Sequence, residues 1–383
     1  MYRLLMTYKI LILMALSLSV HAEFSYLGRS PEGLLMGDAY TAVADDENTL
    51  FYNPAALGRH QGVTIVPLNP TIGVTDVLDK NLSLGEFELG LDSRFKNFPK
   101  EPEAIADRIL GIPLYLQLGA SPVIKMQHFG INFFANSKTS MQLENAIHPT
   151  LDVDYRLDRG VTLGYAFTMG KGKKGTSGSQ TSLGVGLKTM NRQGLDGKFD
   201  LTGTQLLTIV ENSDSYKTIR RNLGYSKGSG VGFDIGAEQT FYMGNSMLNF
   251  GTSLLDIGDT SFSKSEGIGE IPDQDMSLNF GTAYSQDFKI FDYTLAMDYS
   301  NAIDASTAAM SKLKLGARAR FPFVNVYWGW NAGYISWGLG LDIFLFKINV
   351  GFYGVELGPA YKQKEGKRAV FSINLLNIEL DSL

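Results

Sequence analysis

The sequence predicts an all-β protein: a membrane-spanning antiparallel β-barrel of about 14 strands whose N-terminal part forms a helical hatch in the lumen. Three observations support this fold. An export signal begins the chain, a short helix-forming segment follows it, and alternating apolar and polar residues then continue nearly to residue 383. Alternation is expected because every second side chain of a barrel strand faces lipid and the others face the lumen.

The first 22 residues have the composition of a signal peptide. Basic residues precede an apolar run that ends at Val20, and the small residue Ala22 offers a cleavage point. The apolar run is too short to cross a bilayer as a permanent helix. We therefore expect a signal peptide over residues 1–22, a hatch or plug over residues 23–59 and a transmembrane barrel over residues 60–383.

Composition excludes several classes of function. The chain is 44% hydrophobic with a mean hydropathy of −0.03, which is too polar for a bundle of membrane helices and typical of a barrel. The sequence has no cysteine, which rules out disulfides and thiolate metal sites. A net charge of −5 argues against a nucleic-acid partner, because phosphate contacts require clustered Lys and Arg. The four histidines are far apart, so we predict no metal site and no cofactor.

The strand pattern is clearest from Val231 to Phe241, where Phe233 and Ile235 share one face and Asp234 lies on the other. Comparable segments and shorter runs give about 14 to 16 strands. They occupy residues 63–66, 114–120, 129–135, 143–147, 151–155, 161–169, 183–189, 248–254, 276–285, 291–299, 313–321, 324–330, 339–343, 344–352 and 370–378. We expect short turns at residues 158–160, 243–245, 285–287 and 331–333. At residues 342–343 the alternation changes phase, which indicates either a turn or a bulge.

Three inserts interrupt the strand pattern. Residues 102–110 begin with proline and acidic residues and predict a short amphipathic helix, and residues 203–222 could form another. Residues 264–275 are acidic and contain glycine and proline, so we expect a solvent-exposed loop.

The hatch segment, residues 37–57, reads GDAYTAVADDENTLFYNPAAL. Apolar residues at helical spacing predict a helix over Leu35–Ala44. An acidic corner at residues 45–48 ends that pattern. Asn53 followed by Pro54 is a helix start, which predicts a second short helical turn.

This segment resembles the N-terminal hatch of the FadL and PorV superfamily of outer-membrane β-barrels. Members of that superfamily carry a Gly/Ala-rich helix, an acidic corner and an aromatic-Asn-Pro-Ala signature, which correspond here to residues 44–46 and 51–55. The resemblance implies a bacterial outer-membrane location, contact with outer-membrane lipid and 14 strands. The hatch and gate residues that it implies are Gly37, Asp38, Asp45, Asp46, Phe51, Tyr52, Asn53 and Pro54.

Charged residues on the polar face of the strands are expected to point into the lumen. They are Asp234, Glu238, Asp292, Asp298, Lys312, Lys314, Arg318 and Arg320. A Lys or Arg facing lipid near the midplane would cost about 2 to 4 kcal/mol. The basic stripe over residues 312–320 could pair with neighbouring acidic strand residues, hold the acidic corner of the hatch, or bind a substrate carboxylate. Pairing within the protein is favoured, because a polar lumen must satisfy its own charges before a ligand arrives.

The sequence predicts no enzyme. A G-x-S-x-G match at residues 224–228 lacks the helix and the histidine partner that a nucleophile elbow requires. The FadL side of the resemblance implies passive transport of hydrophobic small molecules, with a fatty acid as one possible ligand. The PorV side implies an adaptor that binds secreted or surface proteins at the barrel rim without conducting solute. A soluble exported β-sandwich is a third reading of the same alternation.

Overall fold

The computed structural model describes residues 26–83, 86–91, 102–145, 147–170, 172, 175–200 and 222–380. The expected signal peptide lies outside these residues, as does nearly all of the possible helix at residues 203–222.

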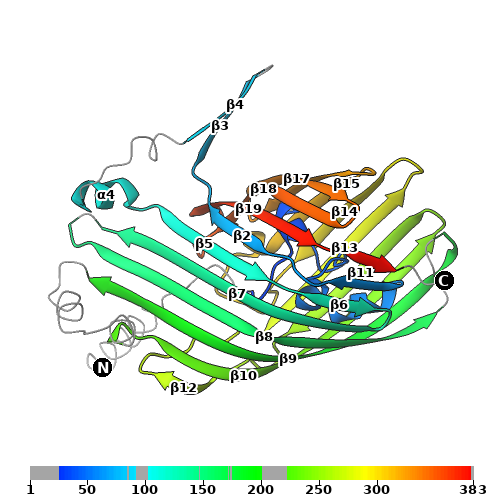
Figure 1. Cartoon of the computed structure of the whole chain (residues 1–383), viewed down its shortest axis with the longest axis horizontal. Helices are drawn as coiled ribbons and strands as arrows, with labels where there is room; N and C mark the ends of the chain where they lie inside the picture. The colour runs from blue at the N-terminus through cyan, green and yellow to red at the C-terminus, as the bar shows by residue number, and fades with distance from the viewer. Residues whose placement is uncertain are drawn as a thin grey trace, which may run out of the picture.

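The wall is a closed ring of 14 antiparallel strands, as the sequence predicts (Figure 1). Around the ring the order is β7, β8, β9, β10, β11, β13, β14, β15, β16, β17, β18, β19, β2 and β5, and β5 pairs back with β7. The strands are β1 Val63–Val66, β2 Thr71–Thr75, β3 Leu78–Ser83, β4 Glu86–Leu91, β5 Pro113–Ala120, β6 Val123–Met126, β7 Phe129–Glu144, β8 Thr150–Gly170, β9 Ser177–Asp200, β10 Ser226–Met243, β11 Ser246–Leu255, β12 Ser263–Gly267, β13 Ser277–Asp287, β14 Asp292–Tyr299, β15 Leu313–Arg320, β16 Val324–Asn331, β17 Tyr334–Ile343, β18 Phe346–Glu356, β19 Glu365–Leu375 and β20 Ile378–Leu380. The helices are α2 Pro31–Leu35, α3 Thr49–Tyr52, α4 Pro102–Ile109, η1 Pro54–Arg59 and η2 Ala309–Lys312.

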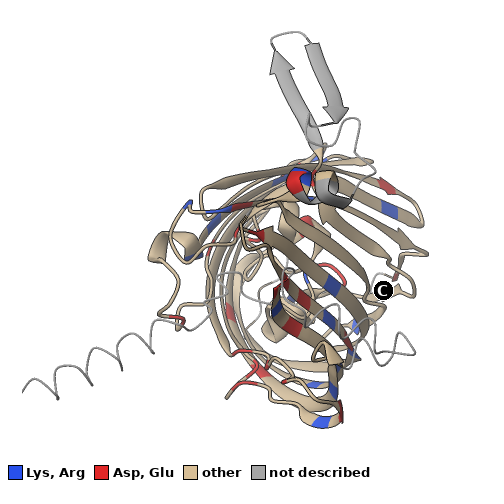
Figure 2. Cartoon of the chain, turned by 90° about the vertical axis from the view of Figure 1, so that its left-hand side faces the viewer, with Lys and Arg blue, Asp and Glu red and all other residues tan. Residues whose placement is uncertain are grey.

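The outer surface of the ring is apolar. On β10, Phe233 is 56% exposed and Ile235 46% exposed, whereas Asp234 between them is 1% exposed. The same alternation recurs on neighbouring strands, and in Figure 2 most of the wall carries neither acidic nor basic residues. An apolar exterior around a closed ring is the arrangement that a bilayer stabilises. Among the described residues, no helix is both long enough and apolar enough to cross a membrane.

The two ends of the barrel differ. Short turns join β10 to β11, β15 to β16 and β17 to β18, and the described chain also finishes at this short-turn end. Longer connections lie at the opposite, long-loop end, including the β3–β4 hairpin and α4 at the left of Figure 1. The predicted helix at residues 102–110 is therefore confirmed as α4.

The wall also differs in height around the ring. Strands β7 to β10, here called the tall wall, contain 16, 21, 24 and 18 residues. Strands β13 to β18, here called the short wall, contain 11, 8, 8, 8, 10 and 11 residues. The tall wall therefore extends well past the short wall at the long-loop end.

Three adjacent strands of the ring are interrupted at one level, which we call the seam. β1 and β2 are two parts of one strand separated by residues 67–70, β5 and β6 are separated by Ser121 and Pro122, and β19 and β20 by residues 376–377. Pro67, Pro70 and Pro122 lie at these interruptions. Because proline lacks the backbone N–H, it cannot donate to a strand ladder.

Two predicted turns are wrong. Residues 158–160 lie inside β8, because the Asp158 carboxylate faces the lumen and accepts two hydrogen bonds from Arg192 at 2.7 and 3.0 Å. The predicted strands at 151–155 and 161–169 are consequently one strand. Residues 285–287 belong to β13, and the chain turns at residues 288–291. The change of phase near Ile343 is a turn, formed by residues 344–345.

The loop at residues 264–275 is only partly solvent-exposed, contrary to the prediction. Arg192 on β9 donates hydrogen bonds to the backbone carbonyls of Pro272 and Asp273 at 2.7 and 3.0 Å, and to the Gln274 side chain at 2.8 Å. Gln274 is 2% exposed. A buried guanidinium requires oxygen partners on all sides, and the loop supplies three of them.

The described part of the expected hatch, residues 26–59, lies inside the ring, in dark blue in Figure 1. Almost every residue from Leu27 to Gly58 is buried. The largest cluster of buried apolar side chains combines hatch residues with lumen-facing wall residues such as Phe134 and Tyr327. The expected plug in the lumen is thus present, and its packing against the wall forms the protein core.

Candidate gate between the hatch and the barrel wall

The first helix of the hatch, α2, begins at a well-formed cap. The Ser30 side chain accepts a hydrogen bond from the Gly33 N–H at 2.9 Å, and Pro31 follows as the first helical residue. Both features favour a helix start. The sequence contains this signal in Ser-Pro-Glu-Gly, one helical turn before the region where a helix was expected.

The predicted helix over Leu35–Ala44 is wrong, because the chain leaves the helical conformation there. Gly37 and Asp38 have φ values of 64° and 63°, in the left-handed region that ends helices. The Asp38 carboxylate is fixed in this conformation by the Tyr52 hydroxyl and the Lys314 ammonium, each donating at 2.7 Å. Residues 36–44 therefore form consecutive turns that follow the inner wall.

The Asn-Pro signature starts a helical turn, as predicted. The Asn53 side chain accepts a hydrogen bond from the Ala55 N–H at 3.0 Å, and Pro54 is the first residue of η1. This turn lies directly on the wall. A Cβ added at Gly236 would overlap the Asn53 side chain, and one added at Gly184 would lie 2.6 Å from the Cα of Ala55. Lumen-facing glycines thus allow the hatch backbone to approach the strands closely.

The two aromatic residues before this signature anchor the hatch differently. Phe51 packs edge to face on Phe134 of β7, with 5.4 Å between ring centroids. Tyr52 packs against Tyr40 at 5.1 Å and donates its hydroxyl to Asp38. Phe51 therefore contacts the wall, whereas Tyr52 joins parts of the hatch to each other.

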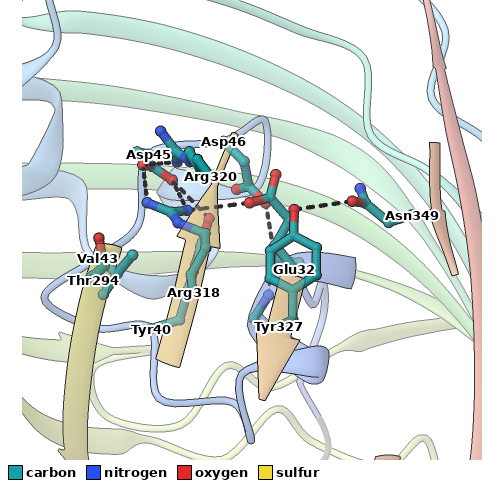
Figure 3. A network of polar contacts seen from close by, with 12 residues as sticks. Glu32, Tyr40, Val43, Asp45, Asp46, Thr294, Arg318, Arg320, Tyr327 and Asn349 are labelled. Atoms are coloured by element: carbon teal, nitrogen blue, oxygen red, sulfur yellow. Dashed lines mark hydrogen bonds and ion pairs between the residues drawn. The ribbon is translucent and has the colours of Figure 1, made fainter. Parts of the chain in front are cut away.

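Ion pairs join the hatch to the short wall (Figure 3). Asp45 accepts hydrogen bonds from Arg318 at 2.8 Å and from Arg320 at 2.6 Å. Glu32 on α2 pairs with Arg318 at 3.2 Å and also with Lys347. Burial alone would raise the pKa of Glu32, but Lys347 and Arg318 lower this pKa to about 2. Glu32 is therefore a charged anchor at neutral pH.

Asp46, next to this anchor, has a different environment. Its carboxylate accepts hydrogen bonds from the Ser30 hydroxyl and from the Asn48 N–H, the latter at 2.9 Å. Burial raises the pKa of Asp46 to about 8, and the nearby Glu47 and Glu32 carboxylates act in the same direction. A carboxylate of α2 that is held charged thus lies near one of the acidic corner that favours its neutral form.

Glu47 connects the hatch to both sides of the seam. Its side chain accepts a hydrogen bond from Asn374 of β19 at 3.1 Å, and its backbone carbonyl accepts one from Asn132 of β7 at 3.0 Å. The same Asn132 amide also donates to the carbonyl of Ser121, at the interruption between β5 and β6, at 3.2 Å. The acidic corner therefore lies directly behind the interrupted strands.

A side chain closes the seam where the backbone ladder is interrupted. The Asn69 amide donates to the Ser121 carbonyl at 2.9 Å and accepts from the Ser121 N–H at 2.6 Å. Next to it, the Lys125 ammonium donates to the backbone carbonyls of Asp45 and Asp46 at 2.6 and 2.8 Å. Wall closure and hatch position are thus joined through one continuous set of polar contacts.

The structure brings four more of the predicted lumen residues into contact with partners. Asp298 accepts hydrogen bonds from the backbone N–H groups of Tyr40 and Thr41 at 2.8 and 2.7 Å. Glu238 pairs with Arg59 at 2.5 Å. The remaining contacts are Asp234 with Lys188 at 2.8 Å, and Lys312 with the Asp304 carbonyl.

Asp292 lies on the strand next to the one that holds the hatch corner. It lies opposite Arg320 in the pairing of β14 with β15, near the short-turn end. Three residues of the basic stripe, Lys314, Arg318 and Arg320, reach the hatch, whereas Lys312 contacts a loop of the long-loop end.

Sequence reasoning missed several residues of this site. Lys188, Lys347 and Glu32 could have been found, since the first two lie on the polar face of predicted strands and the third follows the Ser-Pro cap. Asn69 and Asn132 carry no recognisable signal, because their role depends on which strands become neighbours.

Two cavities lie beside the hatch at the short-turn end. One of about 280 Å³ is lined by the acidic corner, by Lys125 and Arg320, and by Asn374 and Asn377 near the seam. A second, of about 210 Å³, is lined by Arg59, Tyr242 and Met247 among others. The first cavity thus lies between the acidic corner and the seam.

No protein-family model matches the chain, and no curated protein matches it. Solved structures to which it is similar include the toluene transporter TodX of Pseudomonas putida, with 13% identity, 91% of this chain and 98% of that chain covered, and a TM-score of 0.44. The toluene transporter TbuX of Ralstonia pickettii has 12% identity, 92% and 99% coverage, and a TM-score of 0.42. The translocator domain of the autotransporter NalP from Neisseria meningitidis has 8% identity, 89% and 98% coverage, and a TM-score of 0.36.

Proposed function

We propose that this protein is a channel of the bacterial outer membrane for passive uptake of hydrophobic small molecules, with the hatch as its gate. The observation that carries the proposal is the alignment of the seam with the acidic corner of the hatch. At this level the contact between Asn69 and Ser121 joins two neighbouring strands in place of main-chain hydrogen bonds. Main-chain hydrogen bonds still hold each of these strands to its other neighbour.

The surroundings of the seam favour a hydrophobic cargo. Leu68, Ile124, Phe133 and Leu376 lie beside it and are 47, 39, 49 and 49% exposed on the outer surface. These side chains face the hydrocarbon of the membrane, so an apolar molecule leaving through the seam would pass from protein to lipid without entering water. A polar solute would not be stabilised along this route, because it would have to leave water for hydrocarbon.

The hatch residues would then act as the gate in distinct ways. Asp45 ties the corner to the short wall, Glu47 ties it to the seam, and Asn53 with Pro54 fixes the opposite end of the hatch against lumen-facing glycines. Movement of residues 45–48 would remove the Glu47 contacts while η1 stays in place. Under this proposal residues 1–22 direct export, and residues 23–59 and 60–383 are hatch and barrel.

A reversible lock of the hatch tests the proposal. A Cβ at Gly316 of β15 would lie 3.3 Å from the Cβ of Ala39, close to the roughly 3.5 to 4.5 Å that disulfides span. The same Cβ would lie 2.6 Å from the backbone oxygen of Met36, so the hatch backbone must shift there, and the single variant Gly316→Cys measures the effect of that shift. The chain has no cysteine, so the double variant Gly316→Cys with Ala39→Cys can form only this bond within one chain. Uptake of a radiolabelled long-chain fatty acid and of toluene would be measured in cells with and without the protein, before and after reduction.

We expect the wild type to raise uptake above that of cells without the protein. In the oxidised double variant this increase should be at least tenfold smaller, and reduction should restore it. Each single variant, under the same oxidising conditions, controls for the substitutions. Uptake in wild-type cells no higher than in cells without the barrel would overturn transport. A stoichiometric protein partner copurifying with such an inactive barrel would instead support the adaptor role.

A further inference from the structure

The short wall is not tall enough to span a membrane with its strands alone. Strands β14, β15 and β16 contain 8 residues each. At about 3.3 Å per residue and a tilt near 40°, such a strand rises about 20 Å, whereas the apolar band of an outer-membrane barrel is about 25 Å tall. The short wall must therefore gain apolar height elsewhere, or the bilayer must thin beside it.

The turns at the short-turn end of this wall supply apolar surface. Residues 288–291 read Phe-Lys-Ile-Phe, residues 321–323 read Phe-Pro-Phe, and residues 344–345 read Phe-Leu. The exposed fractions are 76% for Ile290, 67% for Phe323 and 90% for Phe344. Turn tips that face water are normally polar, so these sequences indicate an apolar environment.

The first two of these turns form one aromatic cluster. Phe288 stacks on Phe291 with 5.0 Å between centroids, and Phe291 stacks on Phe321 of the next turn at 5.6 Å. In the third turn, Phe344 has a φ of 54°, a left-handed conformation in which Asn or Gly is the usual residue. Phenylalanine is therefore an unusual residue for this backbone conformation. Its presence indicates that the tip of the turn contacts an apolar phase.

The tall wall is different at the same end of the barrel. The apolar outer face of β8 ends with Met169, and the described residues of the following turn are Gly172, Gly175 and Thr176. Between β10 and β11 the turn is Gly244 and Asn245. Apolar turn tips thus occur on the part of the rim where the strands are short.

We propose that the three turns of the short wall insert into the leaflet at the short-turn end, at the boundary between lipid headgroups and acyl chains. The occupant is lipid because the turns continue the apolar outer face of their own strands, which includes Leu295, Val326 and Leu341. Lys289 lies between apolar residues of the first turn and can extend its ammonium to a lipid phosphate. The barrel would sit deeper on this side than on the tall wall.

Spin labels at single cysteines measure this depth directly. The variants would be Ile290→Cys, Phe323→Cys and Phe344→Cys, with Asn245→Cys on the tall-wall rim as the matched control. Each labelled barrel would be reconstituted in phosphatidylethanolamine and phosphatidylglycerol vesicles. Collision rates with oxygen, which concentrates in lipid, and with a water-soluble nickel complex would then be compared, with heat-modifiable migration confirming the fold of each variant.

We expect the ratio of oxygen to nickel collision rates to be at least fivefold higher at positions 290, 323 and 344 than at position 245. Equal ratios at all four positions would overturn the proposal. Labels shielded from both reagents would also overturn it, because a second copy or another protein would then cover the turns. The result does not depend on transport, so it is distinct from failure of the proposed function.

Discussion

The hatch is held on the tall wall mainly by close backbone packing, and on the short wall by such packing together with more ion pairs. η1 rests on β8, β9 and β10, where glycines such as Gly184 allow its backbone to approach, and one ion pair joins it to β10. On the short wall Gly329 allows the same close approach, and Arg318 in addition pairs with both Glu32 and Asp45. An ion pair can exchange partners, whereas closely packed backbones cannot separate without leaving a gap. The comparison indicates that the acidic corner, which is held by charge, can move more readily than η1.

Removal of a short-wall cation gives the largest expected effect. Arg318→Met should destabilise the hatch by about 3 to 5 kcal/mol, because the buried Glu32 and the partly buried Asp45 lose a shared partner. The urea concentration at which a protease cleaves the hatch measures this change. Arg318→Lys keeps the charge but loses the paired N–H donors of the guanidinium. Its cleavage midpoint should therefore lie between those of the wild type and Arg318→Met. An unchanged cleavage midpoint for Arg318→Met would contradict anchoring by charge.

Filling of a tall-wall glycine should have the next largest effect at a fixed pH. Gly184→Ala forces a Cβ against the backbone of Pro54 and Ala55, at a cost of about 1 to 3 kcal/mol by overpacking. The matched control is Gly73→Ala on β2, where the nearest atoms are side-chain atoms at 3.3 Å. Thermal unfolding followed by electrophoretic migration compares the two. Equal stability of both variants would show that close approach to η1 is unimportant.

Two adjacent carboxyls should differ in their response to pH between pH 5 and pH 8. With a pKa raised to about 8, Asp46 binds its proton more tightly in the folded hatch than in the unfolded chain. Its contribution is therefore complete below about pH 4 and is lost as the pH rises toward 8. Asp46→Asn should remove roughly 3 kcal/mol of the decline in hatch stability between pH 5 and pH 8.

Asp45→Asn is the control for that pH dependence. Although burial would raise the pKa of Asp45, Arg318 and Arg320 hold it well below its usual range, so this group is charged throughout pH 5 to 8. Its substitution should lower stability without changing the slope in this window. Parallel pH profiles for the wild type and Asp46→Asn would contradict a neutral Asp46.

The smallest effect is expected for the solvent-exposed ion pairs of the tall wall. Lys198 on β9 lies 3.3 Å from Asp152 and 3.8 Å from Glu144, but its side chain is 53% exposed. Lys198→Met should change stability by at most about 1 kcal/mol, since exposed ion pairs are screened. Chemical unfolding of the barrel measures it. A loss of stability as large as that of Arg318→Met would contradict the expectation that exposed ion pairs contribute less than buried ones.

The sequence predicts the barrel well because alternation is a local property. Phe233, Asp234 and Ile235 reveal their faces without reference to any other strand. The Asn53 and Pro54 helix start was predictable for the same reason. The turn expected at Asp158 failed because turn chemistry is only a preference, and a distant residue, Arg192, decided the outcome.

The gate could be predicted only in part. The basic stripe and the acidic corner were both visible, and pairing between them was one of the alternatives. The seam was not visible, because Pro67 and Pro122 become neighbours only when their two strands pair. Asn69 likewise gains its role from a partner 52 residues away.

The Asn69 contact changes how the wall can open. Two paired strands separate only when a row of main-chain hydrogen bonds breaks together, which is a slow collective event. A side-chain amide that spans an interruption can release by rotation about its own bonds, at the loss of two hydrogen bonds of on the order of 1 kcal/mol each. Such rotations are among the faster motions of proteins. The barrel therefore contains a site where its perimeter can part while the strands on either side stay paired.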